Sequence, residues 1–194
     1  MVTEAAVRQS LLSELLADAR PPVETVFEFW VPRSNERADV AAIGATIDGF
    51  EIKTDRDSLR RLPRQASAYA RVFDRCHAVL APRHVSRALD ILPPWWGVRI
   101  IEDGPTLPTL RPAALNGGVD PETLVRILWR DEAYTALCSL GEPPDPSAGR
   151  FQMWEKLLTL LDVEALKRLV REALLDRNSS WAGRKSSRHA SPAS

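Results

Sequence analysis

Asp39, Glu51 and Lys53 are charged residues inside a largely apolar stretch, "RADVAAIGATIDGFEIKT" (37–54). The stretch indicates two β-strands joined by a short turn. If the turn is Gly44-Ala45-Thr46, Asp39 lies opposite Glu51. Directly opposed residues of an antiparallel pair have Cβ atoms about 4.5–5.5 Å apart on one face of the sheet. Two carboxylates that close repel each other unless a cation lies between them.

This pair of carboxylates therefore predicts a metal site. Mg²⁺, or Mn²⁺ in its place, is the cation expected for carboxylates that leave room for water and phosphate. We expect Asp39, Glu51 and the backbone carbonyl of Ile52 to be its ligands. Because side chains alternate along a strand, Lys53 shares the face of Glu51. Its amine would orient an attacking water or stabilise the charge that develops on a phosphate.

Two alternatives stay open at this point. The dipeptide Asp48-Gly49 is also a strong hairpin signal, and a turn there would leave Asp39 without its partner. A solvated pair of Glu51 and Lys53 on an exposed sheet face would also have the acid-x-lysine spacing. The spacing alone does not separate these arrangements from a metal site.

The elements that would position these residues follow from hydrophobic periodicity and from Gly and Pro. Strands are expected at 23–32, 37–43, 47–54, 76–82 and 96–102, and helices at 4–19, 58–75, 85–92, 120–140, 151–161 and 162–177. A proline-rich connector is expected at 103–118. This order favours an α/β (α+β) fold, a mixed β-sheet flanked by helices with a C-terminal helical appendix. The expected parts are a core at 1–111, the appendix at 112–177 and a disordered basic tail at 178–194.

Composition bounds the class of protein. The chain has 194 residues, of which 44% are hydrophobic, and its formal net charge is zero. That content is sufficient to bury one core with a small extension. No apolar run is long enough to span a bilayer, and acids interrupt the apolar residues of the N-terminus, unlike those of a signal peptide. We expect a cytoplasmic protein with no membrane partner.

The order of these motifs resembles the PD-(D/E)XK nuclease superfamily, which has the restriction-endonuclease-like fold. The resemblance rests on the acid of "RAD", on the hairpin, and on "FEIKT" before a helix. It covers roughly 23–103. More narrowly, this segment looks like a group of small bacterial proteins in that superfamily. "QASAY", Gln65 to Tyr69, is similar to the Q-x-x-x-Y motif of recombination exonucleases, and this spacing places both side chains on one helix face. The resemblance departs from the family pattern at Ala38, because no proline precedes Asp39.

The resemblance implies a Mg²⁺-dependent nuclease that hydrolyses DNA phosphodiester bonds, in DNA repair, restriction or phage defence. The catalytic residues that it implies are Asp39, Glu51, Lys53, Gln65, Tyr69 and Glu28. Gln65 and Tyr69 would support the site from their helix. Glu28 is the preferred match to the early glutamate of the superfamily, with Glu24 and Glu14 as competitors.

Arginines around the helix expected at 58–75 indicate contacts with a polyanion. The residues expected at phosphates are Arg60, Arg61, Arg64 and Arg71. Contacts to phosphate dominate nucleic-acid affinity, although a solvated helix face would have the same pattern. DNA is the expected partner, RNA is a second candidate, and the C-terminal helices are candidates for a homodimer interface. Two other functions stay open, a catalytically silent nucleic-acid-binding module and a partner-binding protein on the same fold.

Overall fold

The chain forms two compact units. The computed structural model describes residues 2–18 and 24–187, with side chains up to residue 177. The units are Met1–Leu124 and Val125–Ser194. The sequence predicted a boundary after residue 111. That residue ends the strand β6 (Thr109–Arg111), and the first unit continues beyond it to Leu124.

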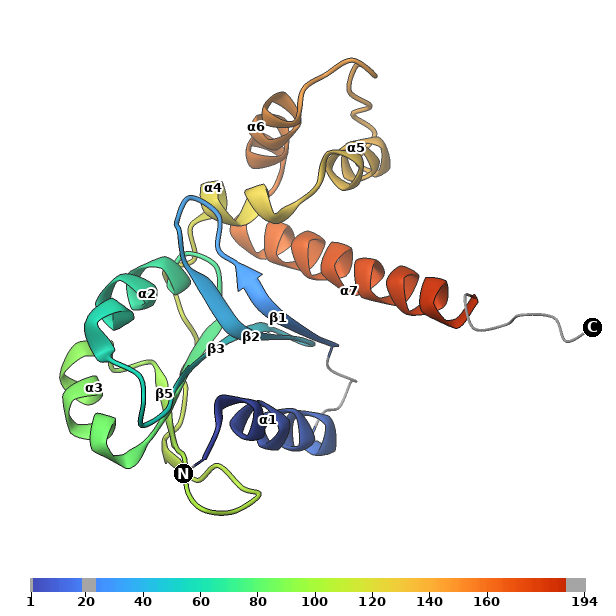
Figure 1. The fold of residues 1–194 in the computed structure, drawn as a ribbon. Coiled ribbons are helices and arrows are strands. Elements are labelled where there is room, and N and C mark those ends of the chain that lie inside the picture. The colour runs from blue at the N-terminus through green and yellow to red at the C-terminus, as the bar shows by residue number, and fades with distance from the viewer. Residues whose placement is uncertain (1, 19–23, 188–194) are drawn as a thin grey trace, which may run out of the picture. The chain divides into compact units, whose positions relative to one another are not determined.

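One mixed sheet organises the first unit (Figure 1). In the described residues it has six strands in the order β1-β2-β3-β4-β5-β6. Their bounds are β1 Glu24–Trp30, β2 Arg37–Ile43, β3 Ile47–Lys53, β4 Arg75–Leu80, β5 Gly97–Ile100 and β6 Thr109–Arg111. The strands β1, β2 and β3 are antiparallel, β3, β4 and β5 are parallel, and β6 is antiparallel to β5. The predicted class, an α+β fold with a mixed sheet flanked by helices, is confirmed.

The hairpin of β2 and β3 turns at Gly44-Ala45-Thr46, as predicted. Ile43 pairs with Ile47, and the Gly44 N–H donates to the Thr46 carbonyl at 2.9 Å. The alternative turn is wrong because Asp48 and Gly49 both lie inside β3. The ladder between the two strands ends one residue short of Asp39.

Helices cover both faces of the sheet (Figure 1). The helix α1 (Glu4–Asp18) lies on one face, where its Val7 and Leu11 are buried among apolar side chains of β2, β3 and β4. The helices α2 (Leu62–Tyr69) and α3 (Val85–Ile91) lie on the other face. Gly49 permits close packing on that side, because a Cβ at this position would lie 2.5 Å from the Phe73 ring. This face of β3 also carries Glu51 and Lys53.

The helix expected at 58–75 is shorter than predicted. It consists of the 3₁₀ turn η1 (Leu59–Arg61) and α2, which ends at Tyr69. Asp74 explains the early end, because its carboxylate accepts the Ile47 N–H at 2.9 Å and its own N–H donates to the Ile47 carbonyl at 2.8 Å. These bonds to the start of β3 hold the chain out of a helix.

The connector expected at 103–118 contains β6. Arg111 pairs with Val98 of β5, and its Nε donates to the Trp96 carbonyl at 2.7 Å. Prolines border this short segment, so its own propensity for a strand is weak, and pairing with the sheet edge decides its structure.

The second unit is helical, and α4 (Pro121–Leu124), the last element of the first unit, directly precedes it. The single helix expected at 120–140 is divided into α4, the 3₁₀ turn η3 (Val125–Ile127) and α5 (Arg130–Ser139), because Trp129 is extended. Its N–H donates to the Glu132 carboxylate at 2.7 Å, which caps α5. The remaining helices are α6 (Arg150–Leu160) and α7 (Val163–Ser187).

The last helix extends beyond its expected end at residue 177. Residues 178–187 were expected to be disordered, but α7 continues through them to Ser187, because extending a formed helix costs far less than nucleating one. The rest of the expected tail, 188–194, lies outside the described residues. Throughout the described ranges, no helix combines the length and the hydropathy that crossing a membrane requires.

Candidate active site

Glu51 is the centre of a buried hydrogen-bond network on the α2 face of β3. Its side chain is 1% exposed and that of Lys53 is 5% exposed. Glu51 Oε1 accepts from Lys53 Nζ and, at 2.6 Å, from Gln65 Nε2, while Glu51 Oε2 accepts from the Tyr69 hydroxyl. The structure thus brings together four predicted site residues, two from a strand and two from a helix. The buried charges are tolerated because they are paired and hydrogen-bonded.

Tyr69 connects this network to the hydrophobic core. Its ring is fully buried and stacks on Trp96 with ring centroids 5.7 Å apart. Burial, and then the charge of Glu51, raise the pKa of Tyr69 well above its usual range, so the phenol keeps its proton. The hydroxyl also lies 2.6 Å from the Arg37 carbonyl. Its single proton is therefore shared between an acceptor on β2 and one on β3.

Gln65 has spare hydrogen-bonding capacity inside the site. Its side chain is 2% exposed, and its Nε2 is used by Glu51. Its Oε1 is buried and has no hydrogen-bond partner among the described residues. An unpaired buried acceptor is costly, so a water or a bound ligand is expected to donate to this oxygen.

Asp39 lies where β2 and β3 separate. Its Oδ2 accepts the Ile52 N–H at 2.6 Å. At this end of the hairpin a bond to a side chain therefore takes the place of a backbone hydrogen bond between the strands. Burial raises the pKa of Asp39 to about 7, and the charge of Glu51 adds to this rise, while the Ile52 N–H and Lys53 act in the opposite direction. A nearby cation would lower the cost of ionising this carboxyl. The contact of Ile52 with Asp39 is through its N–H, and the metal-binding role of its carbonyl stays a prediction.

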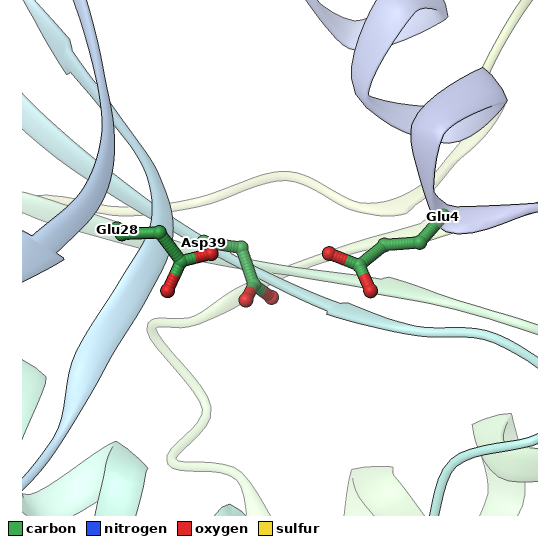
Figure 2. Close-up of side chains that lie close together, drawn as sticks. All are labelled: Glu4, Glu28 and Asp39. Atoms are coloured by element: carbon green, nitrogen blue, oxygen red, sulfur yellow. The ribbon is translucent and has the colours of Figure 1, made fainter.

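Asp39 belongs to a cluster with two glutamates (Figure 2). One oxygen from each of Glu4, Glu28 and Asp39 lies within 4.8 Å of the others. Glu28 is the early glutamate preferred from the sequence, whereas its competitor Glu14 pairs with Arg99. Glu4, from the first turn of α1, was not expected here. Its proximity depends on how α1 lies across the sheet, which no local sequence signal reveals.

Glu28 reaches this cluster with an unusual backbone. Its φ is 50°, in the left-handed region that residues with a Cβ seldom adopt. The flanking pairs of β1 and β2, Phe27 with Val40 and Phe29 with Ala38, place it opposite Asp39. Backbone strain of this kind gathers at functional sites.

A protein cation already lies among these acids. Arg8 Nη2 is 2.8 Å from Glu4 Oε1, 2.6 Å from Glu28 Oε1 and 3.9 Å from Asp39 Oδ1. Carboxylate oxygens are the donors that Mg²⁺ and Mn²⁺ prefer. The donor set therefore fits these metals, and a bound metal would share the cluster with Arg8 or displace it.

The four arginines expected at phosphates differ in their surroundings. Arg60, Arg61 and Arg71 are exposed. Arg64 is also exposed, but its Nε donates to Glu36, whose side chain is 2% exposed. Arg64 thus neutralises a buried acid, and three of the four remain accessible for a polyanion.

The raised pKa of Asp39 predicts a pH-dependent effect of Asp39→Asn on stability. A carboxyl whose pKa is higher in the folded protein than its ordinary value of 3.8 stabilises the fold when protonated and loses this contribution as the pH rises toward 7. In EDTA, Asp39→Asn is expected to raise the free energy of unfolding at pH 8 relative to wild type by about 2 kcal/mol, because Asn carries no buried charge. Urea unfolding at pH 4.5 and pH 8 measures this gain, which should shrink at the lower pH. A gain that is equal at both pH values would contradict the prediction.

The fold and the site define an α+β protein with a buried carboxylate–lysine network next to an acidic cluster. The chain belongs to the family of bacteriophage P4 protein cII, whose family model matches residues 1–192. Protein cII of Enterobacteria phage P4 is 36% identical over 72 residues, which are 37% of this chain and only 26% of the phage protein. Among solved structures, the SPO1766 protein of unknown function from Silicibacter pomeroyi is 20% identical over 66% of this chain and 84% of its own, with a TM-score of 0.39, too low to carry an argument.

Proposed function

We propose that the protein is a Mg²⁺-dependent nuclease that hydrolyses DNA phosphodiester bonds. The observation that carries the proposal is the contact of the Glu51 carboxylate with the Lys53 amine in a buried network beside the ionisable Asp39. Buried charges with perturbed pKa values gather at functional sites. The resemblance to the PD-(D/E)XK superfamily supports the same assignment.

The side chains divide the work of hydrolysis between them. Glu51 holds the Lys53 amine in place, and Gln65 and Tyr69 hold the Glu51 carboxylate. Lys53 then orients the attacking water or donates to a phosphate oxygen as negative charge builds up on it. The water oxygen forms a bond to phosphorus and gives up a proton, the bond from phosphorus to the leaving oxygen breaks, and the leaving oxygen takes up one proton, so the step is balanced. A network fixed in advance needs no reorganisation during this step.

Asp39 would hold the metal, with Glu4 and Glu28 as the neighbouring donors. Bound Mg²⁺ or Mn²⁺ would supply a Lewis acid and lower the pKa of a coordinated water. Glu51 and the Ile52 carbonyl remain predicted ligands. A carboxylate has about four lone-pair sites, so the three donors to Glu51 leave it capacity for a metal.

Cleavage in the presence and absence of metal tests this function. Supercoiled, linear duplex and single-stranded DNA are incubated with the full chain in Mg²⁺, in Mn²⁺ and in EDTA. We expect cleavage with either metal and none in EDTA, and we expect Asp39→Asn to reduce the metal-dependent rate about a hundredfold, because it removes a charged ligand. If wild-type protein leaves every substrate intact in both metals, the proposal is wrong.

One observation favours a second candidate, a catalytically silent nucleic-acid-binding module. Arg8 already offsets part of the negative charge of the acidic cluster, so the cluster depends less on a bound metal. DNA binding in EDTA that is never followed by cleavage would favour this candidate. A cytoplasmic location belongs to both proposals, and dimerisation through the C-terminal helices stays a prediction.

A further inference from the structure

We infer that a pocket next to Lys53 binds a phosphate group of the nucleic-acid chain. The pocket has a volume of about 380 Å³ and is lined by Asp57, Ser58, Leu59, Arg83, His84 and Arg87. None of these residues belongs to the network around Glu51 or to the acidic cluster. The choice of nucleic acid as the source of the phosphate rests on the proposed function, and the binding itself does not require catalysis.

The pocket is built on the residues that directly flank Lys53. The Lys53 carbonyl accepts the Ala81 N–H at 2.8 Å. The next residue, Thr54, donates its N–H and its hydroxyl to Asp57 Oδ2 at 2.8 and 2.7 Å, and its carbonyl lies 3.1 Å from His84 Nε2. The pocket is thus attached to the carboxyl ends of the parallel strands β3 and β4, the edge where open sheets of this kind bind ligands.

Positive charge dominates the lining of this pocket. Arg83 and Arg87 supply two guanidinium groups against one carboxylate, that of Asp57, which Thr54 already engages. Arg83 Nη2 donates to the Asp57 carbonyl at 3.0 Å, and its Nε lies 3.9 Å from Asp55 Oδ1. Within the described chain, the Arg87 side chain forms no hydrogen bond and no ion pair, so its guanidinium group is available to a ligand.

Ser58 adds a donor to the pocket, and His84 ties the pocket wall to the residue after β3. His84 is buried, and the Thr54 carbonyl at 3.1 Å requires a proton on its Nε2, since a carbonyl can only accept. The longer contact from Arg83 Nε to the same nitrogen, at 3.4 Å, is then not a hydrogen bond. The Ser58 side chain forms no capping bond to η1, so its hydroxyl is free to donate to a phosphate oxygen.

The surface around the pocket favours a polyanion over an isolated phosphate. Leu59 opens η1, whose next two residues, Arg60 and Arg61, are both exposed. Basic side chains therefore continue from the pocket along the chain toward α2. A nucleic-acid strand with one phosphate in the pocket would meet further cations on this path.

Binding measured in EDTA tests the inference apart from any cleavage. The affinity of the full chain for a fluorescent single-stranded oligonucleotide is followed by anisotropy at several salt concentrations, with a 5′-phosphate or a 5′-hydroxyl end. Arg87→Ala is expected to weaken binding about tenfold and to reduce the slope of log Kd against log salt by about 0.7, the loss of one phosphate contact on a single strand. Arg33→Ala is the matched control, because it removes the same charge from an arginine that pairs with Glu122 outside the pocket. It should change affinity less than about twofold.

The two oligonucleotides identify the phosphate. If wild type prefers the 5′-phosphate and Arg87→Ala loses that preference, the pocket holds a terminal phosphate. If neither protein has a preference while the salt slope still falls, the pocket holds a phosphate inside the strand. Equal effects of Arg87→Ala and Arg33→Ala, or no binding by wild type, overturn the inference. Binding through Arg87 without cleavage in metal would refute the nuclease proposal alone.

Discussion

Replacing Lys53 with methionine is expected to reduce metal-dependent DNA cleavage about a thousandfold, the usual cost of losing a well-placed donor to developing charge. Methionine keeps the length of the apolar stem and removes only the amine. Because Gln65 and Tyr69 still donate to Glu51, the carboxylate keeps its position. The loss should therefore appear in the rate of cleavage at saturating DNA, while the affinity for DNA in EDTA changes little.

Lys156→Met is the matched control for Lys53→Met. Lys156 belongs to the second unit and pairs with Glu142 on the surface, so this variant loses the same charge without touching the site. It should cleave at the wild-type rate. Circular dichroism and urea unfolding establish that both variants are folded. Cleavage by Lys53→Met within a few-fold of wild type would remove Lys53 from the catalytic residues.

The parts of the site that the sequence predicted well are those fixed by local geometry. The three-residue turn determines the register of β2 and β3, and strand alternation then places Glu51 and Lys53 on one face. The four-residue spacing of Gln65 and Tyr69 places both on one side of α2. The site also requires that α2 packs against β3. The order of the motifs along the chain was sufficient to predict this packing.

The parts that the sequence did not predict depend on contacts between distant segments. Glu4 and Arg8 reach the acidic cluster only because α1 packs across β2 and β3. The Asp39 carboxylate accepts the Ile52 N–H instead of facing Glu51 across a regular ladder. The hydrophobic periodicity of the sequence does not indicate where β2 and β3 separate. In the same way, Arg87 comes next to Ser58 only through the parallel crossover between β3 and β4.

Removing the Glu51 carboxylate is expected to destabilise the fold strongly. Glu51→Ala leaves the Lys53 ammonium, which is 5% exposed, without an anion, and it deprives Gln65 and Tyr69 of their acceptor. Breaking a buried, hydrogen-bonded charge pair on one side costs about 3–5 kcal/mol of unfolding free energy. Lys53→Met should cost less, since Glu51 keeps two of its three donors.

A double-mutant cycle separates this charge effect from a simple loss of packing. If the unpaired ammonium causes most of the loss, Glu51→Ala combined with Lys53→Met should be more stable than Glu51→Ala alone by about 1–3 kcal/mol. The surface pair Glu142 and Lys156, changed in the same way, should show no measurable coupling. Urea unfolding of seven proteins, the wild type and the six variants, provides both cycles. Additive losses at Glu51 and Lys53 would mean that the buried pair is not energetically coupled, and the view of Glu51 as the residue that holds the Lys53 amine would then fail.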